Sequence, residues 1–515
     1  MTTYVYFIGG TGARVLRSLT MLLASGVSLG ANNKIVPIIL DYDSDNGDLE
    51  LSTSLLRSYN KMHTYAEYNL NEDGFFCAPI EVKEKLSRVD LKVQGNKKTF
   101  AQYVEYAAIK DDFAKKFLKT LYDDSVVDDG KENPCAELHL NLEKGFKGNP
   151  NIGSVVFNDY FKTDEYRTFE NDFNQDRIFI VGSIFGGTGS SGLPQLVKWF
   201  RQSSHKESLK NAPIGACVVL PYFKVKKDEN SAINSETFNS KTKAALTFYS
   251  TEINNLINEI YYIGHDSANA RESYSNHEGS KEQKNEAHLV ELLSAMSIVE
   301  FVKRPQDAPS MQKDAHQSYE YTTSTGIKIE KRKNDDSKEE EFVGLKSVSY
   351  LDLLGVSEKN NAFNPVYDNY VCKLNAFAFF SEYYKSYTYK NNDSGTWGLG
   401  KQDYLKTLGS QITQNTTFGE DLMSFLKAFE VWVKELEQNG QLEFKPYTFE
   451  KELEYVLNIA DSDTKIQGIK NLMTGELNAE LKQWKNSKID EKQYPKAFIR
   501  MGTKAGMAAA TKKDK

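Results

Sequence analysis

The start of the chain alternates between apolar runs and a segment with helical spacing. Tyr4–Ile8 is a short apolar run rich in aromatic and β-branched residues, which indicates a buried strand. Gly9–Gly12 interrupts this run, and Arg14–Ala24 then places most of its apolar side chains on one side of a helix. Ile35–Leu40 is a second apolar run. Strand, turn, helix and strand in this order form a βαβ unit, and its right-handed crossover makes the sheet parallel.

The same alternation continues downstream and predicts an α/β domain with a Rossmann-like parallel sheet. Further strands are predicted at Arg177–Val181, Ile214–Leu220 and Glu259–Ile263. Helices are predicted at Thr99–Leu121, Leu193–Gln202, Thr242–Leu256 and Asn285–Phe301. The last of these is apolar on a broad face, so we expect a central core helix there rather than a surface helix.

Changes in composition divide the chain into parts. Residues 1–284 are predicted to form the α/β domain, 285–302 the central helix, and 303–500 a mixed, largely helical C-terminal region. In that region the charged run Lys331–Glu341 predicts a hairpin tip between Gly326–Glu330 and Glu341–Leu345. Helices are expected at Tyr370–Tyr387, Asp403–Gln414, Glu420–Asn439 and Phe449–Ile459. Residues 501–515 are predicted to be a disordered tail.

Composition narrows the classes of partner and compartment. The 515 residues include 64 basic and 71 acidic side chains, which gives a net charge of −7. This acidity argues against nucleic acid as the main partner, because phosphate backbones bind basic surfaces. The four cysteines are scattered and form neither a disulfide framework nor a zinc signature, so we expect a cytoplasmic protein. No apolar run approaches the roughly 20 residues that span a bilayer, so we expect no membrane span.

Two glycine-rich turns have the composition of phosphate-binding loops. Gly9–Gly12 lies between the first strand and its helix, and Gly186–Gly192 follows the strand at 177–181. Glycine lets a phosphate approach the backbone N–H groups closely, and the N-terminus of the following helix adds a positive end. The first turn alone is also compatible with a structural turn or a Rossmann dinucleotide site. The second turn contains four Gly, one Thr and two Ser, which is more specific for phosphate.

The segment Ser183–Gly192, SIFGGTGSSG, resembles the signature loop of the tubulin/FtsZ family, which is GGGTGSG in tubulins and GGGTGTG in FtsZ. The order of features is also similar. Acidic residues Asp41 and Asp43 follow the second strand, Pro221-Tyr222 follows the strand after the signature loop, and the core helix at 285–301 resembles the central helix of the family. The resemblance covers residues 4–301. It implies GTP or GDP as the bound nucleotide, with Mg²⁺.

The resemblance implies a role for each matching residue. Residues placed at the α- and β-phosphates are Gly9, Gly10, Thr11 and Gly12, followed by Ala13 and Arg14. Residues placed at the β- and γ-phosphates are Gly186, Gly187, Thr188, Gly189 and Ser190. Asp41 and Asp43 are implied to lie near the phosphates and metal, and Pro221 is implied to contribute to the site through the Pro-aromatic pair that follows strand 214–220. Asn285 is the candidate reader of the guanine edge, with His265 and Asp266 as further candidates.

Each of these side chains also has an ordinary structural interpretation. Asp41 and Asp43 fit the solvated end of a strand. Asn285 fits a helix N-cap. His288, on the same predicted helix, is interpreted as a core or surface histidine.

The sequence departs from the family at three points. Phe185 stands where the signature has the first of three glycines. The family's Gly-rich loop before its third helix has Gly95-Asn96 as its best match here. In polymerising relatives an acidic pair after the central helix activates water in the neighbouring subunit. Here only Asp307 and Asp314 are available for that catalytic role, and their spacing differs.

Three functions remain open from the sequence. The first is a GTP-binding protein that self-assembles in a nucleotide-dependent way, as a filament or an oligomer, and hydrolyses GTP at a subunit interface. The second is a non-hydrolysing, nucleotide-bound scaffold that binds other proteins. The third is a Rossmann NAD- or FAD-binding protein, although the third Gly is missing and Asp41 lies beyond the ~20 residues expected of a ribose contact.

Overall fold

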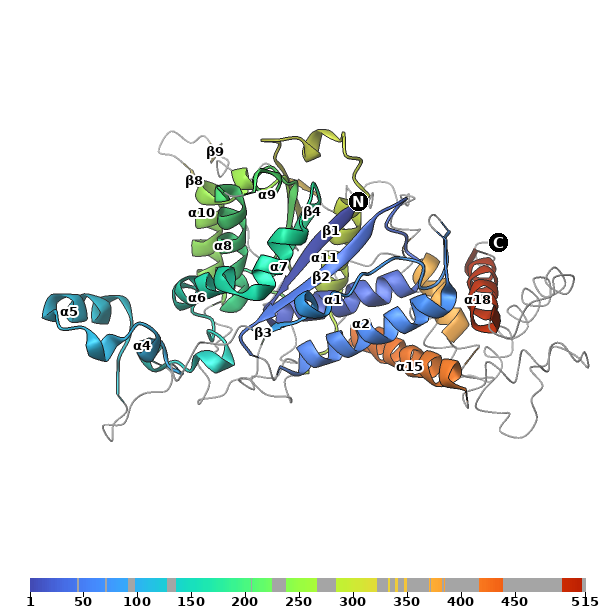
Figure 1. Cartoon of the computed structure of the whole chain (residues 1–515), viewed down its shortest axis with the longest axis horizontal. Helices are drawn as coiled ribbons and strands as arrows, with labels where there is room; N and C mark the ends of the chain where they lie inside the picture. Colours follow the sequence, from blue (N-terminus) through green and yellow to red (C-terminus); the bar gives the residue numbers. More distant parts are fainter. Residues whose placement is uncertain are drawn as a thin grey trace, which may run out of the picture.

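The computed structural model describes residues 1–43, 46–69, 72–90, 98–126, 136–204, 206–224, 238–265, 284–321, 332–333, 339–340, 347–349, 370, 372–381, 384, 416–438 and 493–511. Its centre is one parallel sheet (Figure 1). The strands are β1 (Thr2–Ile8), β2 (Lys34–Asp41), β3 (Val89–Asp90), β4 (Arg177–Ser183), β5 (Ile214–Val219), β6 (Glu259–Ile263), β7 (Gln317–Tyr321) and β10 (Ser347–Ser349). The α/β class and the parallel sheet predicted from the sequence are confirmed.

The strand order is β10-β7-β6-β5-β4-β1-β2-β3, and every neighbouring pair is parallel. Read outward from β1, the order runs through β2 and β3 on one side and through β4 to β7 on the other. The direction of winding therefore reverses between β1 and β4. In open parallel sheets ligands bind at the carboxyl ends of the strands beside such a reversal.

Helices cover both faces of the sheet, which explains why its strands are continuous apolar runs. On one face, Tyr6 of β1 packs against Phe169 of α7 (Asp164–Asp172) and Phe200 of α8 (Thr188–Gln202), with ring centroids 5.4 and 5.7 Å apart. On the other face, Phe179 of β4 packs 5.2 Å from Phe301 of α11. The helices of this second face are α1 (Gly9–Ala24), α2 (Gly47–Ala66) and α11 (Leu289–Lys303). The short α6 (Pro150–Val156) and the longer α10 (Phe238–Glu252) lie on the side of α8 (Figure 1).

The C-terminal helices form a further layer against α1 and α2 (Figure 1). In α15 (Thr417–Gln438) the indole Nε1 of Trp432 donates to Ser18 Oγ of α1 at 3.2 Å. The expected helix at 420–439 is therefore confirmed. In α18 (Tyr494–Thr511) Phe498 and Ile499 are buried. The prediction of a disordered tail from residue 501 is wrong as far as Thr511, because α18 continues to that residue with Met501 and Ala505 buried.

Two predicted helices have different bounds. The segment predicted as one helix at 99–121 is broken into α4 (Phe100–Tyr103), a 3₁₀ turn at Tyr106–Ala108 and α5 (Asp112–Leu121). Glu105 has a left-handed φ of 54° at the break, and Asp111 caps the new helix start by accepting from Phe113 N at 2.8 Å. The central helix begins at Leu289 instead of at 285, because His288 is its N-cap.

The remaining C-terminal predictions fall mostly outside the described residues. Short strands β8 (Arg332–Lys333) and β9 (Glu339–Glu340) pair antiparallel inside the predicted hairpin tip, but its flanks at 326–330 and 341–345 are not described. Residues 372–381 are helical, within the helix expected at 370–387. The helices expected at 403–414 and 449–459 lie outside the described residues. Of the helices that are described, none is long and apolar enough to cross a bilayer.

Candidate functional site

The first glycine turn connects β1 to α1 with no intervening loop. Gly9 opens the helix with φ +68°, a left-handed conformation that strains other residues. A Cβ atom on Gly12 would lie 2.6 Å from the carbonyl carbon of Phe7, so helix and strand pack too closely for a larger residue. Ile8 is the N-cap and supplies no capping side chain. The first-turn N–H groups of α1 are therefore available to an anion.

The second glycine turn connects β4 to α8 through the short loop at residues 184–187. The helix begins at Thr188 with Gly187 as an N-cap that has no capping side chain. A Cβ on Gly189 would lie 2.6 Å from Ser183 N, and one on Gly186 would lie 2.6 Å from Ser183 Oγ. Ser190 turns its hydroxyl back to the carbonyl oxygens of Gly186 and Gly187. Ser190 therefore stabilises the turn through its side chain, while the backbone N–H groups remain at the helix start.

These two turns lie against one another. A Cβ on Gly9 would be 3.4 Å from the Cβ of Thr188 and 3.8 Å from Gly189 N. Both turns follow neighbouring strands, since β1 pairs with β4. Two helix N-termini without capping side chains thus meet at the reversal of the sheet, where their positive ends reinforce each other.

A third loop, which sequence analysis missed, completes this edge. Gly145, Lys147 and Gly148 all have left-handed φ angles, of 76°, 44° and 78°. A Cβ on Gly145 would lie 3.7 Å from Thr188 Oγ1, and one on Gly187 would lie 2.8 Å from the Cβ of Phe146. The sequence GFKGNP, with paired glycines and a proline at the start of α6, carries a signal for such a loop. The previously considered Gly95-Asn96 lies outside the described residues.

Asp41 and Asp43 lie at the same edge, at the end of β2. Leu40 pairs with Ile8, which places Asp41 beside Gly9 across the sheet. Both acids are buried, so they do not form a solvated strand end. Burial, and then the charge of Asp43, raise the pKa of Asp41 to about 7, although Asp41 Oδ1 accepts from Tyr42 N at 2.8 Å. Carboxylates held in this way gain from a nearby cation, which would favour their charged form.

Arg14 is held in a buried network instead of pointing freely into the site. Its guanidinium donates to Asp48 Oδ2 at 2.8 Å, to Glu291 Oε1 at 2.7 Å and to Tyr222 OH at 3.0 Å. The same guanidinium donates to Thr11 Oγ1 at 3.3 Å. The carbonyl of the neighbouring Ala13 accepts from Ser52 Oγ. Arg14 therefore ties the first turn to α2 and α11.

Asn285 joins this network through Asp48. Its backbone N donates to Asp48 Oδ1 at 2.8 Å and its Nδ2 donates to Asp48 Oδ2 at 3.0 Å. The N-cap interpretation of Asn285 is wrong, because His288 occupies that position with Nδ1 accepting from Val290 N at 3.1 Å. Burial, followed by His265 and Arg14, lowers the pKa of His288 to about 3, so the ring is neutral. His288 is thus a buried structural histidine.

The residues that follow β5 and β6 also lie at the carboxyl edge of the sheet. Pro221 follows β5, and His265 follows β6 with its ring 5.7 Å from that of His288. Asp266 lies outside the described residues. Within the described part of the chain, no three His, Cys, Asp or Glu side chains cluster as a metal site. A divalent cation at this edge would therefore need ligands from a bound phosphate as well as from Asp41 and Asp43.

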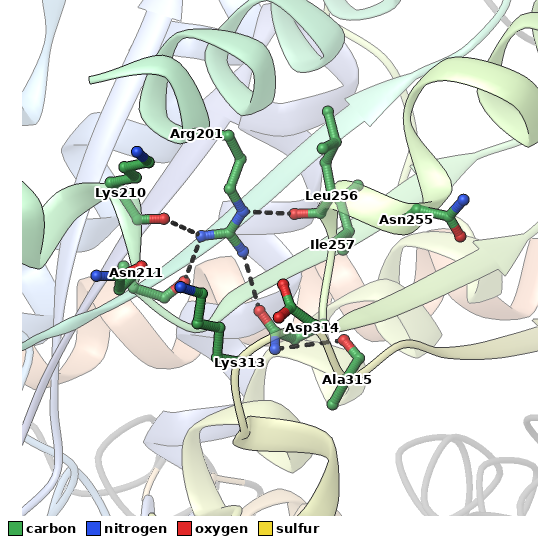
Figure 2. Close-up of a pocket in the computed structure, with 11 residues that line it drawn as sticks. Arg201, Lys210, Asn211, Asn255, Leu256, Ile257, Lys313, Asp314 and Ala315 are labelled. Carbon is green, nitrogen blue, oxygen red and sulfur yellow. Dashed lines mark hydrogen bonds between the residues drawn. The ribbon is translucent and has the colours of Figure 1, made fainter. Parts of the chain in front are cut away.

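Asp307 and Asp314 lie at the opposite edge of the sheet. Both precede β7, at the amino ends of the parallel strands, and both are exposed. Asp314 lines a pocket there with Arg201 and Lys313 (Figure 2). Strands of five to seven residues rise about 3.3 Å per residue and hold the two edges about 15–20 Å apart. These acids cannot reach the glycine turns of their own chain.

Arg201 and Asn258 close this amino edge. Arg201 donates to the carbonyl oxygens of Lys210, Ala212 and Leu256 at 2.8–2.9 Å and to Asn258 Oδ1 at 3.0 Å (Figure 2). Asn258 also accepts from Ile214 N at 2.9 Å and donates to Gln312 O at 2.9 Å. The loops before β5, β6 and β7 are thus tied together by two side chains.

The carboxyl edge combines features that suit a bound anion. It has three glycine-containing loops around Thr188, two helix N-termini and two buried acids beside them. A search against protein-family models and a search of curated proteins found no match for this chain.

Proposed function

We propose that this chain binds GTP or GDP at the carboxyl edge between β1 and β4, in the manner of the tubulin/FtsZ family. The observation that carries the proposal is the meeting of the turns after β1 and β4, with a Cβ on Gly9 lying 3.4 Å from that of Thr188. A nucleotide polyphosphate has the length and charge to accept hydrogen bonds from both turns at once. A glycine turn with only a structural role would not need to lie against a second glycine turn.

On this proposal, different loops of the chain bind different phosphates of the nucleotide. N–H groups of Gly10 to Gly12 face the phosphates nearer the ribose, while those of Gly187 to Gly189 and the Thr188 hydroxyl face the distal ones. The loop at 145–148 covers the distal side. Mg²⁺ carried by the phosphates would neutralise charge there, and Asp41 and Asp43 stand where they can orient its water ligands.

Guanine recognition is proposed for the side of the site formed by the 284–288 segment. Asn285 is 7% exposed and is oriented by its two bonds to Asp48. An amide held in this way can pair with the edge of a base. The rings of His265 and the buried Tyr222 lie 5.7 and 4.9 Å from that of His288, in the same segment.

Hydrolysis, on this proposal, requires a second copy of the chain. Asp307 and Asp314 are exposed at the amino edge, and a head-to-tail neighbour would bring them to the γ-phosphate bound at the carboxyl edge. A carboxylate in that position would orient the attacking water, while backbone N–H groups and Mg²⁺ stabilise the developing charge. The rate per chain should therefore rise with protein concentration.

A second candidate function is a scaffold that retains its nucleotide. The position of Asp307 and Asp314 favours it, since a chain that does not assemble lacks an acid at the γ-phosphate. Such a protein would hold GTP without turnover and bind partner proteins through its C-terminal layer.

The deciding experiment is to denature the purified protein and identify the released nucleotide by chromatography and mass spectrometry. GTP or GDP supports the proposal. NAD or a flavin supports a Rossmann dinucleotide protein instead, and ATP or ADP refutes guanine specificity. Turnover of added GTP, measured against protein concentration, then separates the assembling GTPase from the scaffold.

A further inference from the structure

One carboxylate of the C-terminal layer bonds to two segments of the α/β domain. Glu435, near the end of α15, accepts from Arg17 Nη1 of α1 at 2.6 Å and from Ala287 N at 2.9 Å, both through Oε2. The side chains of Glu435 and Arg17 are 18% and 5% exposed. A mostly buried carboxylate thus joins α1, the segment before α11, and α15.

The pair with Arg17 fixes Glu435 in place. Within the described residues, Glu435 is the hydrogen-bond partner of the Arg17 guanidinium, and a buried guanidinium requires such a partner. One turn earlier on α15, Trp432 donates to Ser18 Oγ, next to Arg17. The end of α15 is therefore anchored to α1 by two adjacent contacts.

The bond to Ala287 connects this anchor to the proposed nucleoside side of the site. Ala287 lies two residues after Asn285, which bonds twice to Asp48. Asp48 in turn accepts from Arg14, whose Nη1 would be 3.6 Å from a Cβ on Gly10. A path of hydrogen bonds, with the backbone of residues 285–287 as one link, therefore runs from α15 to Arg14.

We infer that Glu435 is a positioning residue for nucleotide binding, which couples occupancy of the site to the docking of α15. This inference rests on the proposed function. Glu435 holds the peptide of Ala287, and so places Asn285 for the base, while the phosphate-binding turns do not depend on it. Because such coupling is reciprocal, a bound nucleotide must also strengthen the docking of α15.

The test compares Glu435→Gln with the wild-type full chain. Glutamine keeps an acceptor for Ala287 N but removes the counter-charge of Arg17, so it weakens one of the two contacts that anchor α15 to α1. We expect the Kd for GTP to rise about tenfold, as for loss of a charged hydrogen bond, and the Kd for inorganic triphosphate to stay unchanged. Isothermal titration calorimetry measures both ligands. Glu430→Gln, which breaks the exposed ion pair with Lys434 on the same helix, is the matched control and should behave as wild type.

Hydrogen exchange gives an independent readout. In the wild-type chain, GTP should slow amide exchange in the last turns of α15, and in Glu435→Gln this protection should disappear. Equal GTP affinity in Glu435→Gln and wild type, when the wild type binds, overturns the coupling alone. Parallel loss of GTP and triphosphate affinity also overturns it, because general damage would then explain both. A wild-type chain that binds no nucleotide overturns the proposed function and the coupling together.

Discussion

The two edges of the parallel sheet differ in how their loops are stabilised: side chains bond to the backbone at the amino edge, and helices begin without capping side chains at the carboxyl edge. At the amino edge, Arg201 and Asn258 bond to the loops before β5, β6 and β7. At the carboxyl edge, α1 and α8 begin without capping side chains, and glycines keep the surroundings of Thr188 clear of Cβ atoms. Buried backbone donors require partners. At the amino edge the protein supplies those partners itself, and at the carboxyl edge the helix starts remain for the nucleotide proposed above.

The contrast teaches where stability and binding are located in this chain. The amino edge should govern the free energy of unfolding, since its two side chains join three loops. On the proposed function, the carboxyl edge should govern the affinity for nucleotide, since the three glycine-containing loops meet there. Variants at the two edges should therefore have separable effects.

Gly187→Val should produce the largest effect, at the carboxyl edge. Gly187 has φ −79°, which valine accepts, but a Cβ there would lie 2.8 Å from Phe146 Cβ and 3.0 Å from Gly148 N. The valine would displace the 145–148 loop from Thr188. We expect the Kd for GTP to rise about 100-fold, or about 3 kcal/mol, by calorimetry. Unchanged affinity in a folded variant would remove this loop from the site.

Asn258→Ala, at the amino edge, should lower the stability and leave the affinity for GTP unchanged. The change leaves Ile214 N and one donor of Arg201 without their bonds, in a buried setting. We expect the free energy of unfolding to fall by about 2–3 kcal/mol in urea denaturation, with the Kd for GTP within twofold of wild type. Asn255→Ala, an exposed residue of the same pocket, is the control and should change neither quantity. A large loss of affinity in Asn258→Ala would contradict the separation of the edges.

Asp41→Asn should change the pH dependence of stability. Burial raises the folded-state pKa of Asp41 from 3.8 to about 7. Its stabilising effect is therefore complete below the unfolded pKa and is lost as pH rises through about 7. The variant should gain stability relative to wild type as the pH rises from about 4 to about 7, measured by urea unfolding without nucleotide.

The buried His288 also makes the free energy of unfolding depend on pH. Its pKa is lowered to about 3, so it destabilises the protein as pH falls below its usual range. Both proteins contain His288, and the difference between them isolates Asp41. Asp164→Asn, which changes an exposed side chain, is the control, and its free energy of unfolding should equal that of wild type across this pH range. A wild-type and Asp41→Asn pair with parallel pH profiles would show that Asp41 ionises normally.

Thr188→Val should give the smallest effect. It removes one hydroxyl from the point where the three loops meet and keeps the shape of the side chain. We expect about a fivefold rise in the Kd for GTP, or about 1 kcal/mol, by calorimetry. Thr20→Val is the matched control, since its hydroxyl donates only to Leu16 O of its own helix at 2.8 Å. Equal affinities in both variants would mean that Thr188 contributes through its backbone alone.

Much of the fold was predictable because it depends on local patterns. Strands covered on both faces must be continuous apolar runs, and those runs lie at β1, β2, β4, β5 and β6. The expected helix at 99–121 failed because Glu105 takes a left-handed conformation, which helical periodicity does not reveal. The helical part of the tail was missed since its apolar residues are sparse and are buried only by distant partners.

By itself the sequence determined the parallel α/β core and the two glycine turns, because a short apolar strand and a turn that excludes Cβ atoms are local requirements. Tertiary structure alone decided the rest of the site. It brought the 145–148 loop to Thr188 and bound Asn285 to Asp48 across 237 positions. It also paired Arg14 with the carboxylates of Asp48 and Glu291. Contacts between residues so far apart leave no periodic pattern in the chain, since each partner is satisfied only after the sheet has formed.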